Sequence, residues 1–266
     1  MPPRVLIPLP DRDFDVTEVA VPWKILSRAG VEVVFATERG ATPACDPLLL
    51  SGVIFGQLGA EPEAKAFYGE LERDGAFQRP LAYADVDPAS AHGLLLPGGH
   101  AKGMRQYLES TALFDLVRAY VGLERPLAAI CHGVVVLART LDATTGKSVL
   151  HDRRTTCLPK YMERIAYLST AWKLGDYYRT YPEYVEDEVR RALARPEQLA
   201  RGPLHLFSKG SDESDAAAFV VHDDNYLSGR WPGDAYLLGK ELLRKVKVRS
   251  SSAEDADPES LRSKRG

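Results

Sequence analysis

The segment from residue 125 to residue 139 changes character at a single position. Up to Ile130 it is a short apolar run with the composition of a buried strand, and after Gly133 it is an apolar run with that of a buried helix. Cys131 lies at the junction, with the small residue Ala129 two positions before it and Gly133 two positions after it. A strand that turns sharply into a helix and presents a nucleophile needs small residues at those two places. The segment therefore predicts a nucleophile elbow with cysteine as the nucleophile.

An elbow has consequences for the chemistry of Cys131. It places the thiol at the amino end of the next helix, where unpaired N–H groups and the helix dipole stabilise a thiolate. We therefore expect a lowered pKa for Cys131 and faster alkylation than at Cys45 or Cys157. The adjacent His132 can act as a base. The alternative is a buried structural cysteine, which is a common role for a free cysteine, but the strand-to-helix context favours the nucleophile.

Composition narrows the class of protein. The chain has 266 residues, 45% of them hydrophobic, and a net charge of −3. This suits one large α/β domain and predicts no general attraction to nucleic acid or to membranes. Three cysteines are too few for a disulfide framework and indicate a reducing compartment. With no signal-peptide core and no bilayer-spanning run, we expect a cytoplasmic protein.

The order of apolar and amphipathic segments predicts a doubly wound fold. Strands are expected at residues 5–9, 31–36, 93–96 and 127–130, short strands at 148–150 and 154–157, a hairpin at 217–229, and helices at 17–29, 112–123 and 234–246. The βαβ order favours a mostly parallel sheet with helices on both faces, a three-layer, flavodoxin-like α/β fold.

The sequence predicts one domain that carries an insertion and is followed by a tail. We expect a single domain over residues 1–248, followed by a disordered polar tail over 249–266. Residues from about 41 to 80 form an insertion, with a helix from about residue 62 to 73. Because glycine and proline break this insertion, it is too short to hold a core of its own, so we interpret it as a lid or a side-packing element.

Two further segments are expected to meet the elbow at the carboxyl edge of the sheet, where open α/β sheets bind ligands. Glu18 stands in the first turn of the helix that follows the first strand. Gly98 and Gly99 follow the strand at 93–96 and let the backbone approach a ligand closely. A plain turn is the alternative for these glycines, but together with the elbow they favour an oxyanion hole.

Other site types are excluded by their spacing. Asp11, Asp13 and Asp15 resemble the start of a calcium loop, but Val16 stands where that loop requires glycine. No glycine-rich dinucleotide fingerprint follows the first strand. The histidines show no spacing typical of metal ligands: His100, His132, His151 and His222. We therefore expect no metal and no cofactor.

The motifs and their order resemble the ThiJ/PfpI superfamily, which shares its core with class I glutamine amidotransferases. The matching pieces are Leu95–His100, Ala128–Gly133, Glu18 four residues before Pro22, and the hairpin Asp224–Arg230. The resemblance spans about residues 4 to 247. The elbow preceded by Pro-Gly-Gly-His is the specific part. Ala101 departs from the glyoxalase III and chaperone branch, which often has glycine there.

The resemblance implies roles for particular residues. Cys131 would be the nucleophile and Glu18 a protonated acid beside it, with His132 as the neighbouring histidine. Gly98, Gly99, His100 and Gly133 would line the substrate site, with backbone N–H groups near Gly99 and of His132 forming the oxyanion hole. Relatives place the third member of the triad on an acidic residue after the strand that follows the nucleophile helix. Glu163 is the candidate here, with Asp152 and Asp176 as alternatives.

Several activities are open at this point. The first is a cofactor-independent hydrolase or lyase of the glyoxalase III or deglycase type, which acts on a small carbonyl compound. The second is an amidase, a peptidase-like hydrolase or an isonitrile hydratase. The third is a redox-sensing or holdase protein without catalysis. The resemblance also implies a small-molecule substrate and a homodimer, with neither nucleic acid nor membrane as a partner.

Overall fold

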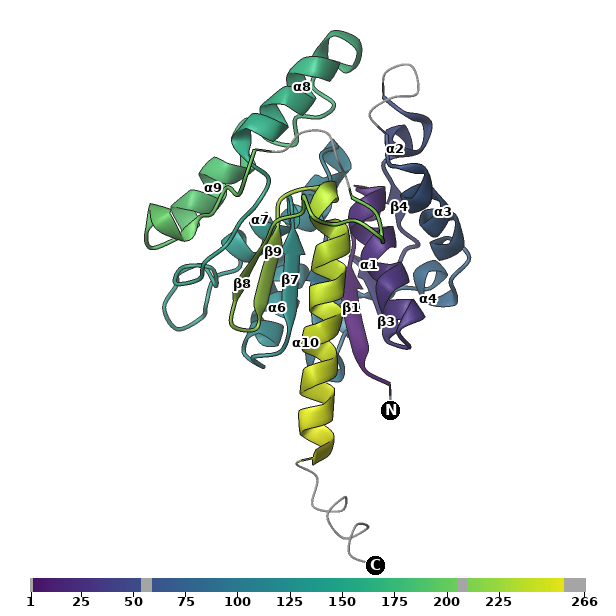
Figure 1. The fold of residues 1–266 in the computed structure, drawn as a ribbon. Coiled ribbons are helices and arrows are strands. Elements are labelled where there is room, and N and C mark those ends of the chain that lie inside the picture. The colour runs from purple at the N-terminus through teal and green to yellow at the C-terminus, as the bar shows by residue number, and fades with distance from the viewer. Residues whose placement is uncertain (1, 54–58, 205–209, 256–266) are drawn as a thin grey trace, which may run out of the picture.

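The computed structural model describes residues 2–53, 59–204 and 210–255. Its centre is a seven-stranded sheet in the order β5-β3-β1-β6-β7-β9-β8 (Figure 1). The strands are β5 (Leu81–Ala82), β3 (Glu32–Thr37), β1 (Arg4–Pro8), β6 (Gly93–Leu96), β7 (Leu127–Ile130), β9 (Tyr226–Gly229) and β8 (Val220–Asp223). Every neighbouring pair is parallel except β8 with β9. The predicted mostly parallel sheet is confirmed.

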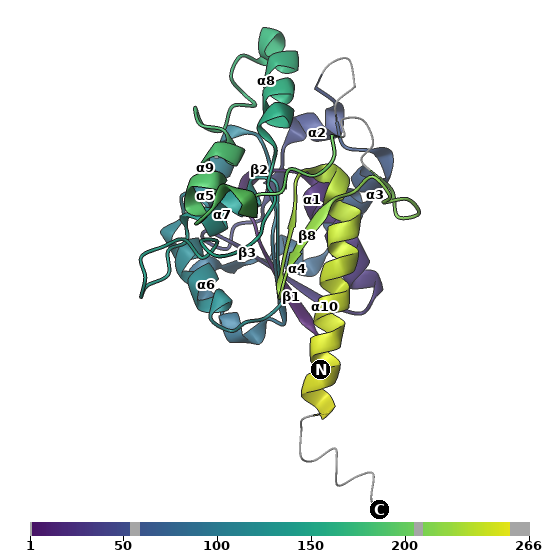
Figure 2. The ribbon, with the colours of Figure 1, turned by 60° about the vertical axis from the view of Figure 1, so that its left-hand side comes forward.

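Helices cover both faces of this sheet. Figure 2 shows α1 (Val16–Arg28) and α10 (Ala235–Asp255) on one side and α6 (Thr111–Val121) and α7 (Gly133–Arg139) on the other. The central strands β6 and β7 are buried along their whole length, as expected for parallel strands covered on both faces. The predicted three-layer architecture is therefore confirmed.

The ends of α1 follow from local sequence. The Asp15 side chain accepts hydrogen bonds from the backbone N–H groups of Thr17 and Glu18, at 2.7 and 3.1 Å. This cap satisfies two donors that a helix otherwise leaves unpaired. Gly30, with φ of +76°, adopts the left-handed conformation just after the helix. The Asp15 cap fixes where α1 begins, and with it the position of Glu18. Gly30 marks where the helix ends.

The insertion at about 41–80 packs onto the main core. It contains β4 (Ala44–Cys45), α2 (Pro47–Ser51), α3 (Pro62–Leu71) and α4 (Gly75–Gln78). β4 pairs in parallel with β2 (Arg12–Phe14) to form a separate two-stranded sheet. The rings of Phe14 and Tyr68, and of Phe35 and Phe77, meet edge to face at centroid distances of 6.1 and 5.3 Å. The described part of the insertion thus contributes to the common core.

The segment between α7 and β8 extends beyond the sheet (Figure 1). It contains α8 (Lys160–Leu174) and α9 (Val185–Ala192). The short strands predicted at 148–150 and 154–157 are wrong, because only isolated bridges join Leu141 to Ser148 and Thr155 to Leu199. Thr155 and Thr156 instead contact β9 through side chains, because Thr155 Oγ1 meets the Tyr226 hydroxyl and the Thr156 N–H donates to Ser228 Oγ, both at 2.9 Å, so no backbone ladder forms.

The C-terminal helix runs further than predicted. α10 ends at Asp255, so the disordered tail predicted from residue 249 is wrong over 249–255, while residues 256–266 lie outside the described part. A helix already formed gains one hydrogen bond for each residue added, which favours its extension.

The remaining elements are short. They are α5 (Arg105–Leu108) and the 3-10 turns η1 (Tyr83–Asp85), η2 (Pro88–Ser90), η3 (Lys102–Met104), η4 (Pro196–Gln198) and η5 (Pro232–Asp234). Within the described residues, none of the helices has the length and apolar character needed to cross a bilayer.

Candidate functional site

The site lies at the carboxyl ends of the central strands. β1 pairs with β3 on one side and with β6 on the other. The chain builds the sheet outward from β1 through β3 and β5, and then returns to the other side of β1 to form β6, so the strand order reverses at β1. Open α/β sheets bind ligands at such a switch point. Here Glu18 comes from α1, Gly98 from the loop after β6, and Cys131 from the residue after β7. The three predicted segments are thus brought together.

The backbone at Cys131 forms the predicted elbow. Its φ is +57°, in the left-handed region that residues other than glycine rarely adopt. A Cβ on Gly133 would lie 2.1 Å from the carbonyl oxygen of Leu96, so no larger residue fits there without moving β6. The strained turn and the required glycine together hold the cysteine at the start of α7.

The paired glycines after β6 are equally constrained. A Cβ on Gly98 would lie 2.6 Å from the backbone nitrogen of His132 and 3.0 Å from Glu18 Oε2. A Cβ on Gly99 would lie 2.6 Å from the carbonyl oxygen of Asp13. The Gly98 N–H donates to Glu18 Oε2 at 2.7 Å. The loop is therefore built to pass close to the site, and its first N–H group positions Glu18 instead of facing a substrate oxygen.

Glu18 is a buried carboxyl group beside the thiol. Its side chain has no exposed surface. Burial, and then the nearby carboxyl group of Asp15, raise the pKa of Glu18 well above its usual value, against the effect of the Gly98 N–H and the Cys131 side chain. A carboxyl group in such a place holds its proton at neutral pH. Glu18 therefore lies next to Cys131 as an acid that can donate a hydrogen bond.

The Cys131 thiol departs from the expectation. It is 1% exposed, and burial followed by Glu18 and Asp15 raises its pKa well above the ordinary value. The backbone N–H of His132 acts in the opposite direction and lowers the pKa. The predicted lowered pKa is wrong, because loss of solvent and two carboxyl neighbours outweigh the amino end of α7. The thiol consequently needs a base.

His132 is placed to be that base. Its Nδ1 lies 3.5 Å from Cys131 Sγ, and its Nε2 lies 3.3 Å from Thr180 Oγ1. The Thr180 hydroxyl donates to the carbonyl oxygen of His100 at 2.6 Å. Since that hydroxyl proton is already engaged, Thr180 accepts a hydrogen bond from Nε2–H. This tautomer leaves the Nδ1 lone pair facing the thiol.

The imidazole of His132 is neutral at rest. Burial lowers its pKa well below the ordinary value, and the neighbouring His100 and Arg139 lower it further. A neutral imidazole with a free lone pair can accept the thiol proton. Cys131, His132 and Thr180 therefore form a connected row of proton donors and acceptors.

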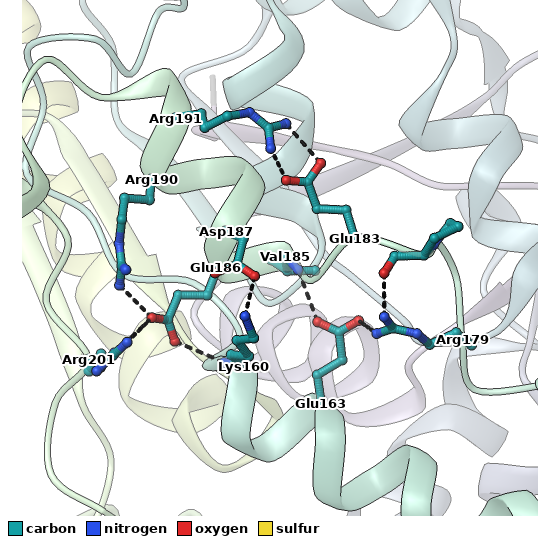
Figure 3. A network of polar contacts seen from close by, with 11 residues as sticks. Lys160, Glu163, Arg179, Glu183, Val185, Glu186, Asp187, Arg190, Arg191 and Arg201 are labelled. Atoms are coloured by element: carbon teal, nitrogen blue, oxygen red, sulfur yellow. Dashed lines mark hydrogen bonds and ion pairs between the residues drawn. The ribbon is translucent and has the colours of Figure 1, made fainter.

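Glu163, the candidate for the third member of the triad, is placed elsewhere. It accepts a hydrogen bond from the Val185 backbone N–H at 3.0 Å and pairs with Arg179 at 3.4 Å (Figure 3). Burial raises its pKa to about 7. Among the described residues, the side chain that contacts His132 Nε2 is Thr180. Glu163 therefore takes part in the contacts between α8 and α9 and does not serve as the partner of His132.

The two alternatives for that role are exposed. Asp176 pairs with Lys102 at 2.6 Å and its side chain is 72% exposed, and Asp152 is also exposed. Sequence reasoning missed Thr180 because it sought an acidic residue, and a threonine among the aromatic residues of 177–184 carries no signal of its own.

A cavity of about 230 Å³ reaches His100, while Cys131 and His132 are not among its lining residues. Its polar wall includes Asp15, His100 and Tyr178. Its apolar wall comes mainly from α8 and from the turn that precedes α10. These residues are Met162, Ile165, Ala166, Trp231 and Pro232. The His100 ring lies 4.9 Å from the His132 ring, edge to face. His100 therefore connects the cavity to the buried nucleophile.

The same three side chains form a cluster of potential metal ligands. One donor atom each from His100, Cys131 and His132 lies within 4.8 Å of the others. Spacing along the chain gave no sign of this cluster, because His100 comes from the loop after β6 and the other two residues from the elbow.

The chain is similar to several known proteins. A family model described as ThiJ/PfpI family-like matches residues 9–203. An uncharacterised protein of Schizosaccharomyces pombe is 30% identical over 254 residues, which are 91% of this chain and 84% of that protein. A deglycase of Pyrococcus abyssi is 25% identical over 244 residues, which are 92% of this chain and 99% of that protein.

A solved structure shows the same fold. Glyoxalase III from Candida albicans superimposes with a TM-score of 0.67 at 18% identity, covering 91% of this chain and 97% of that one.

Proposed function

This chain belongs to the ThiJ/PfpI family, and we propose that it is a cofactor-independent cysteine enzyme acting on a small carbonyl compound such as a 2-oxoaldehyde. One observation carries the proposal. The Cys131 thiol lies between a neutral imidazole, with Nδ1 3.5 Å from Sγ, and a carboxyl group that burial keeps protonated. A nucleophile with a base on one side and an acid on the other suits addition to a carbonyl carbon.

The first step is the addition of the thiol to the aldehyde carbon. His132 Nδ1 takes the thiol proton as the carbon–sulfur bond forms, and Glu18 gives its proton to the developing alkoxide. The step leaves Glu18 as a carboxylate and His132 as an imidazolium, so the hemithioacetal forms without net loss or gain of a proton. Deprotonation of the thiol is coupled to bond formation, which accommodates its raised pKa.

The later steps use the same groups. Glu18, now a carboxylate, removes the proton from the former aldehyde carbon and returns it to the adjacent carbon. His132 meanwhile moves the hydroxyl proton to the adjacent oxygen, which gives a thioester of a 2-hydroxy acid. Water then cleaves the thioester, which releases the acid and restores the thiol, and the imidazolium proton returns to Glu18. One water is consumed for each oxoaldehyde, and no electron acceptor is required. The proposal therefore needs no cofactor.

The surroundings of the site favour a small substrate. The cavity volume of about 230 Å³ is below that typical of drug-sized ligand sites, and it does not admit a folded polypeptide. The names of two relatives, a deglycase and a glyoxalase III, point to carbonyl chemistry. An amidase or isonitrile hydratase would use the same nucleophile, so these activities are the alternatives.

A redox-sensing role is less well supported. Oxidation of a cysteine follows its thiolate character and its exposure, whereas Cys131 is 1% exposed and burial raises its pKa. Slow reaction with peroxide is expected in comparison with a free thiol in solution.

The test is a turnover screen of wild type against Cys131→Ser, with 2-oxoaldehydes, small amides and isonitriles as substrates. We expect turnover of oxoaldehydes that falls more than about a thousandfold in the variant. Cys157→Ser is the matched control, because Cys157 is also buried but lies away from the elbow. Turnover confined to amides or isonitriles would select that alternative, and equal turnover by Cys131→Ser would exclude the mechanism.

A further inference from the structure

The cluster at the elbow has a property that the proposed mechanism does not use. His100, Cys131 and His132 offer two nitrogen donors and one sulfur donor within 4.8 Å of one another. Nε2 of His100 is buried without a hydrogen-bond partner in the described part of the chain. A buried polar atom left unpaired needs an explanation, and a bound ion is one of the common ones.

We propose that His100, Cys131 and His132 bind one Zn²⁺ ion, which reversibly blocks the nucleophile. Zinc accepts imidazole and thiolate ligands and favours tetrahedral geometry. Bonds of about 2.3 Å to sulfur and about 2.0–2.1 Å to nitrogen place two tetrahedral ligands about 3.6 Å apart. Cys131 Sγ and His132 Nδ1 are 3.5 Å apart, so two of the ligands already have the required separation.

The groups around the cluster favour metal binding. Thr180 accepts the Nε2–H of His132 at 3.3 Å and thereby keeps the Nδ1 lone pair on the side of the thiol. A hydrogen bond to the second ring nitrogen is the usual way in which proteins orient a ligating histidine.

The cavity offers room for the fourth zinc ligand and a path by which the ion can reach the cluster. Three protein ligands leave one tetrahedral position for water. His100 lines the cavity, so an ion can reach the cluster from that side. Binding replaces the S–H bond by an S–Zn bond and releases one proton to solvent.

Cobalt(II) is a suitable probe, because its spectrum reports both geometry and thiolate ligation. The experiment uses the full, reduced chain, first stripped with a chelator. We expect one Co²⁺ per chain, a tetrahedral visible spectrum and a thiolate-to-cobalt charge-transfer band. One equivalent of Zn²⁺ should displace the cobalt and stop turnover, and a chelator should restore it.

Variants assign the ligands. Cys131→Ser should lose the charge-transfer band, and His100→Gln should weaken Co²⁺ binding at least about tenfold. Cys157→Ser and His151→Gln are matched controls outside the cluster and should bind within twofold of wild type. Circular dichroism checks that each variant folds. His100→Gln alters a residue of the cavity wall, so it tests the site even where Cys131→Ser fails to fold.

The inference is overturned if wild type shows no charge-transfer band, or if His100→Gln binds Co²⁺ as tightly as wild type. These measurements need no substrate and so are independent of the proposed function. A chelator-treated protein that turns over oxoaldehydes but binds no cobalt would refute the zinc site alone. A protein that binds cobalt but has no turnover would refute the enzymatic proposal alone.

Discussion

Two regions of this molecule bury carboxyl groups, but in one the carboxyl group keeps its proton and in the other it forms ion pairs. At the elbow, Glu18 is fully buried beside another carboxyl group, a backbone N–H and a thiol. Between α8 and α9, Glu186 is 1% exposed but contacts Arg190 at 2.6 Å and Arg201 at 2.5 Å (Figure 3). A buried carboxyl group among cations serves as a structural ion pair, whereas one held without a cation keeps its proton.

Glu163 lies in the second region but shares a feature with the first. It meets one cation, Arg179, at 3.4 Å, and burial is the larger influence, so its pKa rises to about 7. A shifted pKa alone therefore does not mark a catalytic group, because buried structural carboxyl groups are shifted by the same physics. The distinction lies in the neighbours: a thiol for Glu18, and a backbone N–H and a guanidinium for Glu163.

The largest expected difference between the regions is in catalysis. Glu18→Gln should lower kcat by about a hundredfold or more, because an amide can accept the Gly98 N–H but cannot exchange a proton with the substrate. Glu163→Gln is the matched control and should change kcat less than about threefold. Steady-state kinetics with an oxoaldehyde checks both. A comparable loss in the two variants would return Glu163 to the catalytic site.

The second difference is in stability. Glu186→Ala should lower the free energy of unfolding by about 2–3 kcal/mol, because it leaves two guanidinium groups without their shared partner. Glu183→Ala breaks an ion pair with Arg191 in which both side chains are at least 36% exposed, and should cost less than about 1 kcal/mol. Urea denaturation measures both values. Equal losses would mean that burial does not strengthen this network.

The third difference is in the sign of the pH dependence. His100 has a pKa of about 4 in the folded protein and about 6.5 when unfolded. Below pH 6.5 the unfolded chain gains a proton that the folded one does not, so stability falls as pH drops from 6.5 to 4. Glu163, with a pKa of about 7 when folded, keeps a proton that the unfolded chain loses above about 4.5. Stability then falls as pH rises from 4.5 to 7.

Each effect should amount to about 2 kcal/mol or more, since one pKa unit corresponds to about 1.4 kcal/mol. His100→Gln should reduce the loss on the acid side, and Glu163→Gln the loss toward neutral pH, while His132 and Glu18 keep their own shares. Denaturation curves at several pH values, with chelator present, measure the two slopes. Slopes of the same sign in the two difference profiles would contradict the assignment.

The smallest expected effect concerns the tautomer of His132. Thr180→Val removes the acceptor of Nε2–H while preserving the shape of the side chain, so the wrong tautomer becomes accessible. We expect kcat to fall about tenfold, or about 1.4 kcal/mol in activation free energy, with KM unchanged. A shifted pH profile of kcat would accompany it. Thr180→Ser, which keeps the hydroxyl, should restore activity, and an inactive serine variant would speak against this positioning role.

The sequence predicted well what depends on short-range pattern. The elbow at Cys131, the helix that carries Glu18 and the glycine pair at Gly98 and Gly99 all follow from residues within a few positions of one another. The start of α1, for example, is fixed by the Asp15 cap, whereas Gly98 and Gly133 are required by close contacts with distant segments. The short strands near Cys157 were wrong because β composition cannot show that Thr155 and Thr156 contact β9 through side-chain hydroxyl groups and form no backbone ladder.

The sequence did not predict contacts in the site between residues that are far apart along the chain. The partner of His132 is Thr180, 48 positions away, and the donor cluster joins His100 to the elbow from another strand. No pattern in a single sequence links such positions. The length of α10 was missed for a different reason, because its polar end resembles a tail and helix extension depends on the turns before it.

The sequence by itself determined where the chain bends, because the apolar strand pattern ends at Ile130 and the helical pattern begins at Gly133. The tertiary structure decided the protonation of the thiol, which the sequence alone assigned wrongly. A pKa depends on how much solvent is removed and which charges lie nearby, and both are fixed only when β1, β6 and β7 come together.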